Sequence, residues 1–183
     1  MNNYSPNIDS AVRHQKSSQL ADTITPQLID GFGRHIDYAR LSLTDRCDFR
    51  CVYCMADNMQ FLPKKQILSL EEILLVAQSL SAIGIRKIRL TGGEPLIRSN
   101  MLWLVEQLNK IDSLEEITLT TNGSQLTKYA KQLALHGVKR INISLDSLNE
   151  RKFLEITRTG KLPQVLSGVQ AAKAAGFDSI KLN

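Results

Sequence analysis

The segment SLEEILLVAQSLSAIGIRKIRLT (69–91) indicates the repeating unit of the fold, because it reads as a helix followed at once by a strand. Ser69 and Glu72 form the S-x-x-E pattern that caps the start of a helix, and Gly84 stands where that helix should stop. Apolar residues at steps of three and four predict one face packed on the core: Ile73, Val76, Leu80 and Ile83. The segment that follows, IRKIRLT (85–91), is typical of a strand.

The same alternation of helix and strand continues along the chain. We expect strands at 38–44, 85–91, 114–121, 138–146 and 177–183, and helices at 69–84, 100–111, 126–137 and 161–176. Gly137 and Gly176 again mark helix ends. This order predicts an α/β fold of repeated βα units around a parallel sheet, either a closed or partial barrel or an open doubly wound sheet. In both architectures ligands bind at the carboxyl ends of the strands.

The composition favours one folded domain behind a polar leader. The 183 residues are 43% hydrophobic and 22% charged, which suits a domain with a substantial core. Residues 1–30 are rich in Ser, Asn, Gln and Thr, so we expect a flexible leader there and the domain at 31–183.

The charge and apolar patterns limit the compartment and the partners. The sequence has no apolar run of about 18 residues and no apolar signal-peptide core, so we expect a cytoplasmic protein that does not enter a membrane. The net charge of +5 is spread along the chain rather than gathered into a basic arm, and nucleic acid is therefore not an expected partner.

All three cysteines lie in CDFRCVYC (47–54), directly after the first expected strand. Three thiols cannot close into a full set of disulfides, and structural zinc normally takes four protein ligands. The C-x3-C-x2-C spacing of Cys47, Cys51 and Cys54 instead suits a 4Fe-4S cluster with one iron left open. The alternatives are three incidental cysteines, or a redox pair with one to spare.

Three further loops follow the expected strands: TGGEP (91–95), TTNG (120–123) and SLDS (144–147). Paired glycines in the first would let a ligand approach the backbone and would expose N–H donors. Gly-Gly-Glu-Pro and Asn-Gly segments also form ordinary turns, so the TGGEP and TTNG loops alone do not establish a site.

Basic residues occur within three different expected strands: Arg40, Arg89 and Lys181. Ile88 and Leu90 flank Arg89 and should occupy the opposite face of the sheet. Basic side chains that point into one barrel interior need an anion, so together the three would suit a phosphate group. Individually, each also fits a solvated charge.

These residues resemble a known superfamily. The segments CDFRCVYC, RLTGGEPLIR and SLDS are similar to those of the radical S-adenosylmethionine (SAM) superfamily. FGRHIDYARLSLTDRCDFRCVYCM (32–55), IRLTGGEPLIR (88–98), LTTNG (119–123), INISLDSL (141–148) and IKLN (180–183) resemble, in this order, the MoaA family of GTP 3',8-cyclases. The likeness runs from about residue 28 to the end of the sequence.

The resemblance implies a partial (βα) barrel of the radical SAM type that stops at about its fifth strand. It also implies a 4Fe-4S cluster on Cys47, Cys51 and Cys54, with SAM chelating the open iron. Reductive cleavage of SAM would yield a radical that takes hydrogen from the ribose of GTP, and ring closure onto guanine would give 3',8-cyclo-7,8-dihydro-GTP for molybdenum cofactor biosynthesis.

The resemblance also implies roles for single residues. Those matching SAM-binding positions are Tyr53, Gly93, Glu94 and Ser144, and those matching GTP-binding positions are Arg40, Arg89, Thr120 and Lys181. The implied partners are an electron donor and cyclic pyranopterin monophosphate synthase as the next enzyme, and a homodimer is left open.

The sequence departs from the family pattern at two kinds of place. Asp48 stands where the family usually has Asn, and CMAD (54–57) replaces Cys-Met-Pro-Glu. Family members are also longer and hold a second 4Fe-4S cluster on three further cysteines, whereas this chain is expected to be an N-terminal portion. The alternatives are a radical SAM enzyme for another substrate and a non-catalytic fragment that binds the cluster.

Overall fold

Five parallel strands form a single sheet in the computed structural model, which describes residues 27–56 and 58–183. The strands are β1 (Tyr38–Ser42), β2 (Lys87–Thr91), β3 (Glu116–Thr121), β4 (Val138–Ile143) and β5 (Ser179–Leu182). Their order across the sheet is their order along the chain, with β1 and β5 at the two edges. A doubly wound sheet would reverse its strand order at a switch point, so the predicted partial barrel is confirmed. Most of the predicted leader, 1–26, lies outside the described residues.

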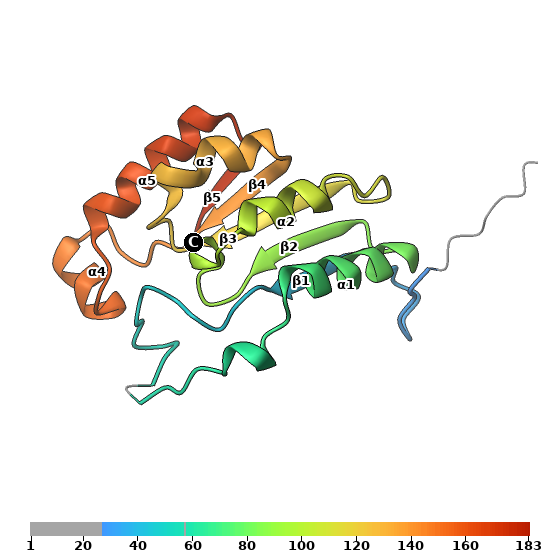
Figure 1. The fold of residues 1–183 in the computed structure, drawn as a ribbon. Helices are drawn as coiled ribbons and strands as arrows, with labels where there is room; N and C mark the ends of the chain where they lie inside the picture. The colour runs from blue at the N-terminus through green and yellow to red at the C-terminus, as the bar shows by residue number, and fades with distance from the viewer. Residues whose placement is uncertain (1–26, 57) are drawn as a thin grey trace, which may run out of the picture.

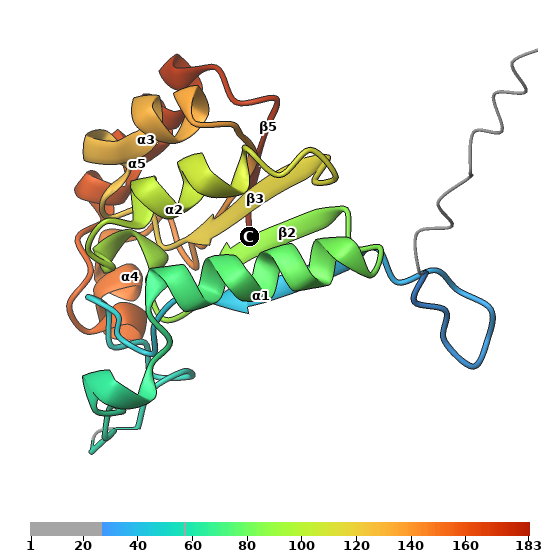
Figure 2. The same cartoon turned by 45° about the vertical axis from the view of Figure 1, so that its right-hand side comes forward.

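Helices cover one face of this sheet. Figures 1 and 2 show α1 (Leu70–Ala82), α2 (Met101–Leu108), α3 (Leu126–Leu135) and α5 (Leu162–Ala175) along the outer face of the strands. The short helix α4 (Glu150–Thr157) lies instead beyond the carboxyl ends of the strands (Figure 1). Two single 3-10 turns, η1 (Lys64–Gln66) and η2 (Pro95–Ile97), lie in the loops after β1 and β2. No helix in the described part of the chain is long and apolar enough to cross a membrane.

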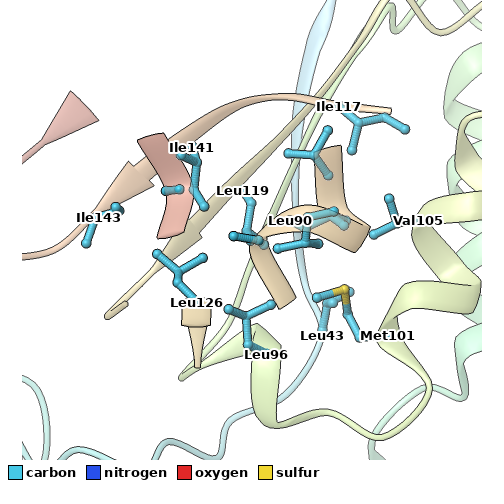
Figure 3. Close-up of a cluster of buried hydrophobic side chains, with 14 of the residues drawn as sticks. Leu43, Leu90, Leu96, Met101, Val105, Ile117, Leu119, Leu126, Ile141 and Ile143 are labelled. Atoms are coloured by element: carbon cyan, nitrogen blue, oxygen red, sulfur yellow. The ribbon is translucent and has the colours of Figure 1, made fainter. Parts of the chain in front are cut away.

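The core lies between the sheet and these helices. Leu90, Leu119 and Ile141 are neighbours in register on three adjacent strands, and all three are fully buried (Figure 3). Ile88 is also fully buried, as predicted for the residues that flank Arg89. Side chains alternate along a strand, so Arg89 points to the opposite face of the sheet. None of the helices in the described part of the chain covers that face (Figures 1 and 2).

Helix α1 confirms its predicted cap but not its predicted apolar face. The Ser69 hydroxyl accepts from the Glu72 N–H, and the Glu72 carboxylate accepts from the Ser69 N–H. The buried residues are Leu70, Ile73, Ala77 and Ser81. Val76 and Ile83 are each 37% exposed, so the predicted face was wrong at these two positions. The helix is apolar around much of its surface, and the side with small residues packs on the sheet because it allows the closest approach.

Strand β4 contains an irregularity that the alternation of the sequence does not reveal. The register with β3 passes from Ile117↔Val138 directly to Thr118↔Arg140, so Lys139 is an extra residue. Val138 and Ile141 therefore both face the core although they are three residues apart. The bulge places Arg140 in the same row as Arg89, on the face without helices.

Candidate functional site

Four loops meet at the carboxyl edge of the sheet, as the sequence predicts for a parallel fold. The loop after β1 holds Cys47, Cys51 and Cys54, and we call residues 45–56 the cysteine loop. The other three loops begin with TGGEP after β2, TTNG after β3 and SLDS after β4. Figure 1 shows the long loop after β1 and helix α4 together at this end of the molecule.

Helix α4 holds the cysteine loop in place. The backbone N–H groups of Arg50 and Val52 donate to the carbonyls of Thr157 and Ile156, at 3.0 and 2.9 Å. The Thr159 hydroxyl donates to the carbonyl of Asp48 at 2.9 Å. Carbonyls at the end of a helix have no partner within it, so they are available to the loop.

Helix α4 was not among the helices predicted from the sequence. Its signals are present: the Asn149 side chain accepts from the Lys152 N–H as a cap, and Phe153 and Thr157 form a buried pair one turn apart. Eight residues are too few for a strong apolar period, and for this reason the pattern was missed.

The TGGEP loop lies directly against the cysteine loop. The N–H groups of Gly93 and Glu94 donate to the carbonyls of Thr44 and Arg46, at 2.7 and 2.8 Å. A Cβ atom at Gly93 would lie 2.2 Å from the Arg46 carbonyl oxygen. The glycine therefore permits close approach of the chain to itself, and the N–H of Gly93 is bonded within the protein rather than exposed for a ligand as predicted.

Glu94 joins the TGGEP and TTNG loops from a fully buried position. Its carboxylate accepts from the Leu96 N–H at 2.9 Å, the Thr121 hydroxyl at 2.8 Å and the Asn122 N–H at 2.7 Å. Burial raises the pKa of Glu94 to about 7, although the three donors oppose the shift. The carboxylate faces protein groups here, and the predicted part of Glu94 in SAM binding stays a prediction.

Asn122 and Asp48 lie beside Cys47. The Asn122 amide nitrogen is 2.7 Å from one Asp48 carboxylate oxygen and 3.7 Å from the Cys47 sulfur. The Ser124 hydroxyl donates to the other Asp48 oxygen at 2.6 Å. Neither Asn122 nor Asp48 was a predicted site residue, because TTNG alone also fits an ordinary turn and Asp48 was noted only as a departure from the family pattern. The contact between these two loops was therefore not predicted.

Two of the three thiols, Cys47 and Cys51, are partly buried. Burial raises the pKa of the Cys47 thiol to about 11, and the Phe49 N–H donates to its sulfur at 3.4 Å. Burial also raises the pKa of Cys51. Such thiols keep their protons until a metal replaces them. Among residues 27–56 and 58–183, no group of three or more His, Cys, Asp or Glu side chains could hold a metal ion. A 4Fe-4S cluster needs a wider spacing, because its three thiolates bind three different irons.

The residues predicted to bind SAM lie around this same edge. The Tyr53 hydroxyl donates to the Asp146 carboxylate at 3.2 Å, which joins the cysteine loop to SLDS. The Ser144 N–H donates to the Thr121 carbonyl at 2.9 Å and so fixes SLDS to TTNG. Tyr53, Gly93 and Ser144 thus belong to loops that contact one another at the carboxyl edge of the sheet. Their role in SAM binding stays a prediction.

The residues predicted to bind GTP share the face of the sheet without helices. Arg40 and Arg89 are register partners on β1 and β2, and Thr120 and Lys181 are both register partners of Asn142 on β4. The Arg89 Nε and Thr120 hydroxyl atoms are buried and have no hydrogen-bond partner among the described residues. The Arg89 guanidinium lies over the Tyr38 ring, 5.7 Å from its centroid.

Arg140 lies on the same face of the sheet as Arg40, Arg89, Thr120 and Lys181, which we call the basic face, although it was not a predicted site residue. It follows Arg89 and Thr118 in one register row, and its Nε is 3.5 Å from a Glu116 carboxylate oxygen. The bulge at Lys139 changes the parity of β4, so alternation read from Val138 assigns Arg140 to the wrong face.

Comparison with known proteins identifies close relatives. The chain is 58% identical over 159 residues to the GTP 3',8-cyclase of Ectopseudomonas mendocina (strain ymp), covering 87% of this chain and 48% of the relative. It is 60% identical over 156 residues to the GTP 3',8-cyclase of Pseudomonas fluorescens (strain Pf0-1), covering 85% and 47%. The chain therefore spans about half the length of the curated relatives it matches.

Solved structures share the fold at low identity. Streptococcus suis SuiB bound to S-adenosylmethionine matches with a TM-score of 0.66 and 16% identity, covering 79% of this chain and 33% of that chain. Methylornithine synthase (PylB) matches with a TM-score of 0.60 and 14% identity, covering 79% and 43%. The family model described as the radical SAM superfamily matches residues 41–183. The chain therefore belongs to the radical SAM superfamily, whose members use a 4Fe-4S cluster and SAM.

Proposed function

We propose that this chain carries the radical SAM part of a GTP 3',8-cyclase, which converts GTP into 3',8-cyclo-7,8-dihydro-GTP in molybdenum cofactor biosynthesis. The identity of 58–60% to curated GTP 3',8-cyclases supports GTP as the substrate. The solved radical SAM structures are too distant in sequence to support more than the fold. The domain would be 31–183.

The structural observation that most favours a nucleotide substrate concerns two buried polar atoms. The Arg89 Nε and Thr120 hydroxyl atoms are buried without a hydrogen-bond partner among the described residues, and both lie on the face that also carries Arg40 and Lys181. A buried donor without a partner costs free energy, so an anionic ligand with several acceptor oxygens would satisfy it. A triphosphate fits this requirement.

The cysteine loop and its neighbours would hold the cofactors. Cys47, Cys51 and Cys54 would ligate the cluster, and Tyr53, Gly93, Glu94 and Ser144 would surround SAM. When bound, the cluster and SAM supply the one-electron cleavage of SAM that starts radical chemistry. The protein's own residues fix the loops: Glu94 ties TTNG to TGGEP, and the α4 carbonyls hold the cysteine loop. Fixed loops orient the reactants and keep water away from a radical.

The proposed reaction also defines its partners. It needs an external electron donor, and its product would pass to cyclic pyranopterin monophosphate synthase. We place the reaction in the cytoplasm. The question of a homodimer stays open, and sedimentation of the purified chain would answer it.

The test is an anaerobic assay of the whole chain. The protein is reconstituted with iron and sulfide, reduced with dithionite and incubated with SAM, with and without GTP, and 5'-deoxyadenosine is measured by chromatography. We expect GTP to stimulate deoxyadenosine formation. Stimulation by another nucleotide but not by GTP would overturn the assignment of GTP as the substrate. A chain that binds the cluster but never cleaves SAM would be a non-catalytic fragment.

A further inference from the structure

We propose that Asp48 and Asn122 tune the reduction potential of the cluster in opposite directions: Asp48 lowers it, and Asn122 raises it. This inference rests on the proposed ligation of the cluster by Cys47. Both residues act through the sulfur of Cys47 rather than by touching substrate, so they are positioning and tuning residues and not catalytic ones.

The geometry places both groups against the same sulfur. One oxygen of Asp48 lies 3.9 Å from the Cys47 sulfur, and the Asn122 amide nitrogen lies 3.7 Å from that sulfur. The Asn122 nitrogen is also 2.7 Å from the same Asp48 oxygen. Its two hydrogens can therefore serve the sulfur and the carboxylate together.

The orientation of the Asn122 amide is fixed by a third contact. Its oxygen accepts from the Ser124 N–H at 2.9 Å, so the nitrogen must be the atom that faces Cys47 and Asp48. Two further neutral groups donate to the Asp48 carboxylate: the Ser124 hydroxyl at 2.6 Å and the Gln125 amide at 3.4 Å. The carboxylate is thus held firmly beside the sulfur by groups that do not cancel its charge.

The electrostatic consequences have opposite signs. Reduction adds one electron from an external reductant to the cluster, and a neighbouring carboxylate disfavours that added negative charge. An N–H group that donates to a ligating sulfur favours it. Loss of Asp48 should therefore make reduction easier, and loss of Asn122 should make it harder, because the sulfur loses a donor and the carboxylate loses part of its screening.

The experiment is a redox titration of the reconstituted full chain, followed by the EPR signal of the reduced cluster, with dithionite as the reductant. Asp48→Asn removes the charge but keeps the shape of the side chain. The new side-chain oxygen can still accept from Asn122, and the new amide can donate to the Ser124 hydroxyl. We expect a midpoint potential more positive than that of the wild type. We expect Asn122→Ala to shift it to a more negative value. Asp112→Asn, which removes an exposed charge in the loop before β3, should leave it unchanged.

The outcomes separate this inference from the proposed function. If the wild-type chain forms no cluster, the ligation by Cys47 fails and this inference fails with it. If the cluster forms and Asp48→Asn and Asn122→Ala leave the potential unchanged, or shift it in the same direction, only the inference is overturned. If Asp48→Asn does not take up a cluster, Asn122→Ala and Ser124→Ala test the inference instead. Each removes a donor to the Asp48 carboxylate, so each should give a more negative midpoint potential.

Discussion

The ring of Phe153 packs against the ring of Phe49 at 83°, with centroids 5.9 Å apart, so an aromatic pair joins helix α4 to the cysteine loop. Phe153 is 1% exposed and Phe49 is 5% exposed. Edge-to-face pairs contribute beyond the area they bury. Together with the two backbone hydrogen bonds to Thr157 and Ile156, the pair makes α4 the support on which the cysteine loop rests.

Phe153→Ala should therefore weaken both the fold and the uptake of the cluster. Removing a buried phenylalanine costs about 3–5 kcal/mol of the free energy of unfolding. Chemical denaturation followed by circular dichroism measures this loss, and iron analysis after reconstitution measures the cluster. Leu154→Ala is the matched control, since Leu154 is 52% exposed and should change stability by only about 0.5 kcal/mol. Equal effects of the two variants would contradict the role of the aromatic pair.

Cys51→Ala should abolish the visible absorption of the 4Fe-4S cluster after anaerobic reconstitution. The variant loses one of the three thiolates that would ligate the cluster, and the sequence has no fourth cysteine to replace it. Val52→Ala, at the neighbouring half-exposed position, should keep the chromophore. An unchanged spectrum in Cys51→Ala would refute the assignment of the ligands.

Arg89→Ala should weaken the binding of GTP while SAM cleavage remains measurable. A hydrogen bond to a charged group contributes roughly 1.5–3 kcal/mol, so the Kd for GTP should rise about 10- to 150-fold. Isothermal titration calorimetry measures the affinity, and the deoxyadenosine assay measures cleavage. Arg151→Ala removes the same charge from a side chain that is 89% exposed on α4, and should leave both unchanged. Equal loss of GTP binding and SAM cleavage in Arg89→Ala would give Arg89 a structural role instead.

The elements of the fold were predictable because the sequence marks them locally. Ser69 with Glu72 and the glycine at 84 define α1 almost to the residue, and the apolar alternation of Ile88 and Leu90 gives the buried face of β2. The order of the strands was not predictable in this way. A βα repeat is compatible with a barrel or with a doubly wound sheet, and only pairing between distant strands distinguishes them.

The site was predictable as a set of loops but not as a set of contacts. The position of the cysteine loop after the first strand follows from the pattern, and the close approach of Gly93 to Arg46 does not, because it depends on how two loops pack. The bulge at Lys139 likewise moves Arg140 to the basic face through a register shift that no local signal announces. Contacts of this kind depend on tertiary packing between segments far apart in the sequence.

Glu94→Gln should remove a pH dependence of stability that the buried carboxyl creates. Burial raises the pKa of Glu94 in the folded protein to about 7, whereas its ordinary value is 4.5. Between these two values the folded protein holds a proton that the unfolded chain releases, so the free energy of unfolding falls as pH rises through this window. The total contribution is about 3 kcal/mol at most. A glutamine does not titrate and cannot contribute to this slope.

Thermal unfolding of the chain before cluster reconstitution, followed by circular dichroism at a series of pH values, measures the effect as a difference. Other carboxyl groups titrate equally in both proteins, so they cancel when the variant is subtracted from the wild type. We expect the advantage of the wild type to shrink between about pH 4.5 and 7, and to stay constant above that range. Parallel profiles would mean that the three donors from Leu96, Thr121 and Asn122 hold Glu94 ionised throughout, since hydrogen bonds to a carboxylate oppose the effect of burial.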